Sequence, residues 1–292
     1  MTRAFKNIHT DHFWSLYASI ACLFFIALPV VSSAQAGPAS RKDLVSIALK
    51  DNYSLTLRFN AYPRFAFDMW LPELAIFDSD LDRSQVAQPI EGVWLGKWQG
   101  NLQVEGRLTT GNKGMDFMCT LKPLTGDAIM LDLEVSNSGQ VDWNDYAQLA
   151  VCLAPSEGNH AFSDKTGERS YVSSPHAGIQ RITKAGVVGD FNHYAVEGHS
   201  DPGDTIQRAQ VKDGFVARQS ADGQLTLSFM WDEAARVDVN PGGLDCIHSD
   251  PAAGPLKAGE TKILHGFIMI GEGTVKDRYT AMQNLIKEHR AE

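Results

Sequence analysis

The chain has 292 residues, of which 43% are hydrophobic, and its formal net charge at pH 7 is −9. An acidic chain without a basic stripe lacks the electrostatic footprint of a nucleic-acid-binding protein. Attraction to anionic membrane surfaces is disfavoured for the same reason. A neutral ligand, or a cation that bridges to an anionic ligand, fits this composition better.

The first 36 residues are typical of a secretory signal peptide. Arg3 and Lys6 give it a basic start, and an apolar run follows from Leu16 to Val31. Ala34-Gln35-Ala36 then supplies a small-residue cleavage site. An uncleaved membrane anchor is the alternative, but the run is short for a spanning helix. We expect residues 1–36 to be removed, which leaves a secreted or periplasmic protein without stable membrane insertion.

From Leu44 to Ile270, apolar and polar residues alternate with a period of two. The apolar positions include Leu55, Leu57 and Phe59; Leu102, Val104 and Leu108; Ile129, Leu131, Leu133 and Val135; and Leu225, Leu227, Phe229 and Trp231. Such half-buried segments, separated by turn residues, indicate antiparallel strands. About a dozen strands predict an all-β fold, a large antiparallel two-sheet β-sandwich that forms a single domain over residues 37–292.

Only the C-terminus shows a clear helical period. Thr274 can cap a helix, and one apolar stripe contains Val275, Tyr279, Met282, Leu285 and Ile286. The spacing predicts an α-helix over about 274–290 that packs on the protein's own sheets. A helix that binds a partner is the alternative.

The stretch from Gly158 to Asp213 is rich in His, Gly, Ser, Asp and Asn and alternates weakly. Long irregular connections often line a binding face. Alternation places Glu197 and His199 on one face, with His193 nearby. A Glu beside a His is the pairing expected for general acid and base chemistry on a neutral substrate. The alternative is a solvated loop whose acids and glycines only shape turns.

The tetrapeptide His-Ser-Asp-Pro occurs twice, at residues 199–202 and 248–251. We expect both copies to meet at one pocket, where Asp201 and Asp250 would bind the substrate. A distance above about 15 Å between Glu197 or His199 and His248 would contradict this, since one small ligand could not touch both.

Cys246 and His248 are two residues apart and share one face of the predicted strand. Parity places Cys152 on the polar face of its own strand, whereas Cys119 alternates with core residues. Two thiolates and one imidazole suit zinc or copper and would leave a fourth coordination position open. The sequence does not identify the cofactor, and a divalent metal is one interpretation of this set. A Cys152–Cys246 disulfide is the competing outcome in an oxidising compartment. The simplest alternative is a buried cysteine beside a histidine that bonds to the backbone.

Trp94 and Trp98 flank Gly96 and Lys97 in a turn-like region that also contains side-chain amides. Exposed aromatic rings beside amides suit sugars, whose apolar faces stack while their hydroxyls are hydrogen-bonded. Ordinary partial burial of two large side chains is the alternative.

The C-terminal third resembles a group of uncharacterised secreted bacterial proteins with a Cys-x-His-Ser-Asp-Pro motif. The matching segments are Cys246-Ile247-His248-Ser249-Asp250-Pro251, Ala258-Gly259-Glu260-Thr261 and Gly271-Glu272-Gly273. Val151-Cys152-Leu153 and Gly167-Glu168-Arg169 also look similar, whereas Ala258 replaces the usual Pro. The resemblance implies a secreted β-sandwich of the galactose-mutarotase-like kind, whose relatives handle carbohydrates. It implies no established reaction.

Together these features favour a secreted or periplasmic carbohydrate-active protein, a mutarotase-like epimerase or lyase. The expected acid–base residues are His193, Glu197, His199 and His248. The expected substrate-binding residues are Trp94, Trp98, Asp201 and Asp250. One alternative is a non-catalytic carbohydrate-binding or envelope-associated module. The other is a periplasmic metal-binding protein that uses Cys152, Cys246 and His248.

Cleavage after Ala36 is directly testable. The intact mass of the exported protein is expected to correspond to a chain that begins at Gly37. An exported product that still carries residues 1–36 would contradict the signal-peptide assignment.

Overall fold

The structure, a computed structural model, describes residues 44–50, 54–77, 102–110, 112–143, 147–181, 187–190, 207–209, 211–240 and 245–290. All of them lie in one unit of the chain, Pro38–Glu292. The predicted signal peptide lies outside the described residues. So do six of the predicted site residues, namely Trp94, Trp98, His193, Glu197, His199 and Asp201.

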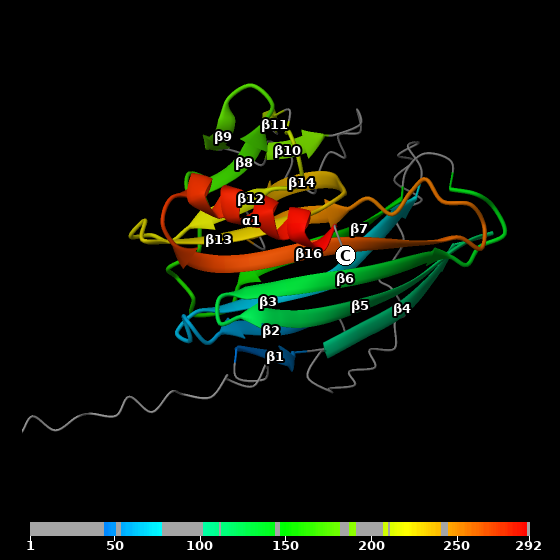
Figure 1. Cartoon of the computed structure of the whole chain (residues 1–292), viewed down its shortest axis with the longest axis horizontal. Helices are drawn as coiled ribbons and strands as arrows, with labels where there is room; N and C mark the ends of the chain where they lie inside the picture. Colours follow the sequence, from blue (N-terminus) through cyan, green and yellow to red (C-terminus); the bar gives the residue numbers. More distant parts are fainter. Residues whose placement is uncertain are drawn as a thin grey trace, which may run out of the picture. The chain divides into compact units, whose positions relative to one another are not determined.

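The described strands form two eight-stranded sheets (Figure 1). Sheet A contains, in spatial order, β1 (Val45–Leu49), β2 (Ser54–Phe59), β3 (Ala66–Phe77), β7 (Ala147–Pro155), β15 (Cys246–Pro251), β14 (Ala234–Asn240), β10 (Val187–Asp190) and β11 (Gln207–Ala209). Sheet B contains β4 (Leu102–Thr110), β5 (Lys113–Thr125), β6 (Ala128–Asn137), β16 (Thr261–Glu272), β13 (Leu225–Trp231), β12 (Val216–Gln219), β8 (Ser170–Ser174) and β9 (Gly178–Arg181). All pairs are antiparallel except β10 with β11. The predicted all-β two-sheet sandwich is confirmed.

The structure has more strands than the dozen predicted from the sequence. The additional strands are short, such as β9, β10 and β11 with 4, 4 and 3 residues. They lie in the stretch from Gly158 to Asp213, where the alternation is weak. A three- or four-residue strand is too short to establish a period of two, so only pairing with neighbours reveals it.

The inward faces of the two sheets supply the main hydrophobic core. The alternating residues of β2 and β6 show this, since Leu55, Leu57, Leu131 and Leu133 are all 0% exposed. Full burial of such a side chain contributes roughly 1.5–3 kcal/mol. Cys119 belongs to this core, as its parity predicted. The period-two pattern therefore identified the core-facing side of the long strands correctly.

The predicted C-terminal helix is α1 (Val275–His289), which lies on strands of sheet B (Figure 1). Thr274 caps it and forms a reciprocal capping box with Asp277. Val275, Met282 and Ile286 are buried and pack in a cluster with residues of sheet B. The apolar stripe thus serves the protein's own fold. Among the described residues, no helix is long and apolar enough to cross a membrane.

The middle of sheet A has a buried outer face as well as a buried inner face. In β15, Ile247 points into the core and Cys246, His248 and Asp250 point to the outer side, yet every residue of the strand is buried. Buried polar groups are costly unless they are hydrogen-bonded or paired. The partners of these outward side chains therefore define the chemistry of this face.

A buried ion pair determines where β15 begins. Asp245, directly before the strand, has a φ of 53°, in the left-handed region that Asp tolerates better than most residues. Arg218 Nη1 lies 2.7 Å from the Asp245 carbonyl oxygen and 2.8 Å from its Oδ1. Ser163 Oγ and the backbone N–H of Asp164 also donate to the Asp245 carboxylate. This network sets the position from which Cys246 and His248 extend.

We predict that Arg218→Met destabilises the fold by about 3–5 kcal/mol, because removal of one partner leaves the buried Asp245 carboxylate uncompensated. Urea unfolding followed by fluorescence measures the change. Arg107→Met is the matched control, since Arg107 and Asp116 pair at the surface with side-chain exposures of 70% and 34%. The control is expected to unfold like the wild type. An Arg218 variant as stable as the control would contradict the anchoring role.

Candidate metal centre

A row of directly paired residues crosses the outer face of sheet A. Trp70 on β3 is opposite Cys152 on β7, Cys152 is opposite His248 on β15, and His248 is opposite Asp238 on β14. Directly opposite residues of antiparallel strands point to the same face, with Cβ atoms about 4.5–5.5 Å apart. The register therefore brings a thiol, an imidazole and a carboxylate together from three strands.

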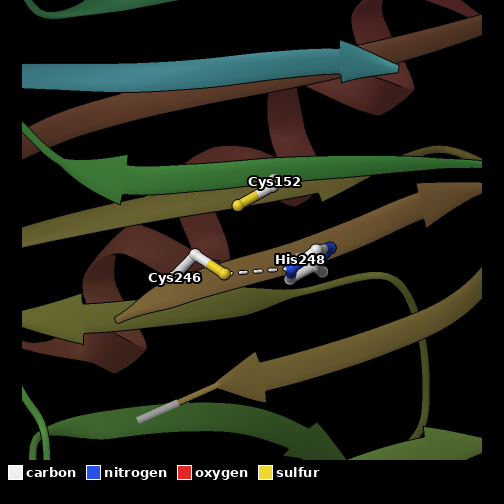
Figure 2. Close-up of side chains that lie close together, drawn as sticks. All are labelled: Cys152, Cys246 and His248. Carbon is white, nitrogen blue, oxygen red and sulfur yellow. Dashed lines mark hydrogen bonds between the residues drawn. The ribbon is translucent and has the colours of Figure 1, made fainter. Parts of the chain in front are cut away.

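Cys246 joins this row because it precedes His248 by two residues on β15. Its Sγ lies 3.1 Å from His248 Nε2. The ligand atoms of Cys152, Cys246 and His248 all lie within 4.8 Å of one another (Figure 2). Cys152 and Cys246 are 0% exposed and His248 is 5% exposed. In the part of the chain that the structure describes, this is the one group of His, Cys, Asp or Glu side chains arranged to hold a metal ion.

The two nitrogens of His248 face different partners. Nδ1 lies 3.6 Å from Asp250 Oδ1, whereas Nε2 faces Cys246. Asp250 is itself fixed, because its Oδ1 accepts the backbone N–H of Val151 at 2.9 Å. Metal-binding histidines usually direct their second nitrogen toward a carboxylate, which sets the tautomer. This geometry leaves Nε2 as the nitrogen that can bind a metal.

Glu73 is a member of the site that the sequence did not predict. The pairing of β3 with β7 shifts between Trp70 and Leu74, where Trp70 pairs with Cys152 but Leu74 pairs with Ala150. This irregularity places Glu73 Oε2 3.8 Å from His248 Nε2. Bulges commonly redirect a side chain in this way. Pro72 was the available signal, because a Pro inside a strand-like run marks an edge or a bulge.

The thiols and the imidazole influence one another strongly. A hydrogen bond from Cys152 and the adjacent charged ring of His248 hold the pKa of Cys246 well below its usual value, despite burial. Burial acts to lower the pKa of His248, but Cys246 and Asp250 together raise it well above its usual value. Burial raises the pKa of Cys152. The favoured form is a Cys246 thiolate beside a protonated His248, and a thiolate is the form that binds metals or attacks electrophiles.

Carboxylates surround this pair. Burial raises the pKa of both Glu73 and Asp238 above the usual values, because their charged forms lose hydration. Asp238 also forms a buried ion pair with Arg236. Among the described residues, these two carboxyl groups, Asp250 and the Cys246 thiol thus lie near Arg236 and His248. A cation placed among them would stabilise the charged forms of the acidic groups.

The strand register disfavours a Cys152–Cys246 disulfide. Cys152 is directly opposite His248, so Cys246 occupies a diagonal position. Diagonal neighbours lie about 7–8 Å apart between Cα atoms, whereas disulfides usually require about 4.4–6.8 Å. The described cysteines Cys119, Cys152 and Cys246 are free in the structure.

The other predicted site residues divide into two groups. Asp250, predicted to bind substrate, is 2% exposed and lies against His248 and the backbone of β7. The remaining predicted acid–base and sugar-binding residues lie outside the described residues. The convergence of the two His-Ser-Asp-Pro copies therefore stays a prediction.

Comparisons with known proteins find similar solved structures at low sequence identity. No protein-family model matches the chain, and no curated protein matches it. Among solved structures, a galactose mutarotase-like protein from Lactobacillus casei is 10% identical, with a TM-score of 0.40, over 77% of this chain and 100% of its own. A galactose mutarotase-like protein from Clostridium acetobutylicum is also 10% identical, with a TM-score of 0.39, over 80% of this chain and 100% of its own. A likeness of this size carries no argument about the activity of this chain.

A thiol count tests the state of the cysteines. We expect the mature protein, purified without reductant and unfolded in guanidinium with EDTA, to contain three free thiols. The diagonal register keeps Cys152 and Cys246 too far apart for an unstrained disulfide. Titration with Ellman's reagent gives the count, and a value of one instead of three would show that the disulfide forms.

Proposed function

We propose that the protein binds a divalent transition metal, zinc in the first place, through Cys152, Cys246 and His248. The observation that carries the proposal is the convergence of three buried ligand atoms within 4.8 Å of one another. Ligand atoms of a tetrahedral zinc ion with sulfur and nitrogen donors lie roughly 3.5 Å apart. The strands hold the donors within 4.8 Å of one another, so small side-chain rotations would bring them to this spacing.

The electrostatics of the site support a cation. Glu73, Asp238 and Asp250 all lie around the thiol pair, and their mutual repulsion acts on the charged forms. Buried charges in proteins are generally paired or coordinate metals. A divalent ion would offset this negative charge and would release the proton of His248, since a metal-bound imidazole is neutral.

Nucleophilic catalysis by Cys246 is a competing interpretation of the same residues. Cys246, His248 and Asp250 follow one another at alternate positions of β15, in the order of a nucleophile, a base and an orienting acid. In that mechanism Cys152 would act only by lowering the pKa of the Cys246 thiol. In metal binding Cys152 is itself a ligand, so that function uses both buried thiols.

Action on a carbohydrate is a second candidate function, as a mutarotase-like epimerase or lyase or as a non-catalytic binding module in the periplasm or outside the cell. The observation that favours it is Glu73 beside His248, a carboxylate and an imidazole with shifted pKa values. Such pairs perform acid and base catalysis on neutral substrates. A sugar panel and a glycan array with the mature protein test this function, and a lack of both turnover and binding would contradict it.

The metal proposal predicts one zinc ion per chain. Replacing a residue that only supports a metal ligand typically weakens metal binding by about tenfold to a hundredfold. Cys246→Ser and His248→Ala each remove a ligand itself, so each is expected to weaken zinc binding more than about a hundredfold. Competition with a chromophoric chelator measures the affinity, and elemental analysis by mass spectrometry measures the stoichiometry.

Cys119→Ala is the matched control, since Cys119 is an equally buried free cysteine in the core between the sheets. This variant is expected to keep one zinc ion per chain with unchanged affinity. Failure of the reduced wild type to bind zinc, copper or cobalt would contradict the proposal. Equal weakening by all three variants would also contradict it, because it would reflect general destabilisation.

A further inference from the structure

Glu73 differs from the three proposed ligands in its access to solvent. Its side chain is 31% exposed, whereas that of His248 is 6% exposed and both cysteines are fully buried. Among the described members of the site, Glu73 is therefore the group that an outside molecule meets first. A site built only to hold a structural ion usually surrounds it with four protein ligands.

Glu73 lies close to the metal-binding nitrogen without belonging to the set of donors. Its Oε2 is 3.8 Å from His248 Nε2, the nitrogen that faces Cys246. The donors that lie within 4.8 Å of one another are Cys152, Cys246 and His248, and they do not include Glu73. Among the described residues no fourth donor joins this set, and Glu73 is the carboxylate beside its imidazole nitrogen.

We propose, on the basis of the metal site above, that the fourth position of the ion takes a neutral ligand with an acidic O–H group, and that Glu73 accepts the proton. When the ligand binds, a metal–oxygen bond forms and the O–H bond breaks. The proton moves to Glu73 Oε2, so no other reactant is required. Water, an alcohol or sugar hydroxyl and a hydroxamic acid all belong to this chemical class.

The surrounding charges specify a neutral ligand. Asp238 and Asp250 lie close enough to Glu73 to repel its charged form, so an anionic ligand beside Glu73 would meet repulsion from three carboxylates. A neutral molecule meets no such repulsion, and it becomes an anion only after the metal polarises it. Glu73 is placed to remove the proton at that step, because the bulge in β3 holds its carboxylate beside the ring nitrogen.

Cobalt(II) in place of zinc gives a direct measurement, because its visible spectrum reports a change of ligands. The reduced mature protein is loaded with one cobalt per chain and titrated with two probes. Acetohydroxamic acid is neutral and loses a proton on coordination, whereas imidazole coordinates without losing one. Both probes are expected to change the spectrum of the wild type in a saturable manner.

Glu73→Gln keeps the shape of the side chain but cannot accept a proton. It is expected to bind one cobalt per chain, to bind acetohydroxamic acid about tenfold to a hundredfold more weakly than the wild type, and to bind imidazole with nearly unchanged affinity. Glu134→Gln is the matched control, since Glu134 is an exposed glutamate on β6 of the other sheet. It is expected to behave as the wild type with both probes.

Each remaining outcome overturns a defined part of the inference. A loaded wild type that responds to neither probe has a closed site. A Glu73→Gln variant that no longer holds cobalt identifies Glu73 as the fourth ligand. Equal effects of this variant on both probes exclude proton transfer to Glu73. Failure of the wild type to bind cobalt at all contradicts the proposed metal function, which is measured first and separately.

Discussion

The chemistry of this protein depends on the burial of acidic groups and thiols on the outer side of sheet A. A charged group that loses its hydration must find a partner, change its protonation state or bind an ion. Here Asp238 pairs with Arg236, while the pKa of Cys246 is lowered and that of His248 is raised by their mutual contact. The acidic groups that surround the thiols are the physical basis of the proposed cation site.

The architecture brings these groups together through register. Trp70, Cys152 and His248 come from strands that are far apart in the chain, and Asp238 lies on the strand before that of His248. They form one row because their strands are neighbours in sheet A. The same register sets Cys246 diagonal to Cys152, which favours shared coordination over a disulfide. The register thus bears on two chemistries that the residue types alone leave open.

Two local irregularities adjust this regular framework. The left-handed backbone of Asp245, held by Arg218, lies directly before β15, the strand that carries Cys246 and His248. The bulge in β3 adds residues to one strand and directs Glu73 toward His248. Both irregularities lie next to the cluster, where a regular ladder would have provided the thiols and the imidazole but no accessible carboxylate.

The sequence by itself determined the sandwich, the C-terminal helix and the side of each long strand that faces the core. The periods of two and 3.6 are local, so residues such as Leu55, Leu57 and Met282 reveal them without knowledge of the partners. The same parity placed Cys246 with His248, and Cys152 away from the core. Only the tertiary structure decided that β7 and β15 are neighbours, that Cys152 is opposite His248 and that Glu73 reaches the site. These facts depend on pairing between distant segments and on a bulge, and neither leaves a periodic trace in the chain.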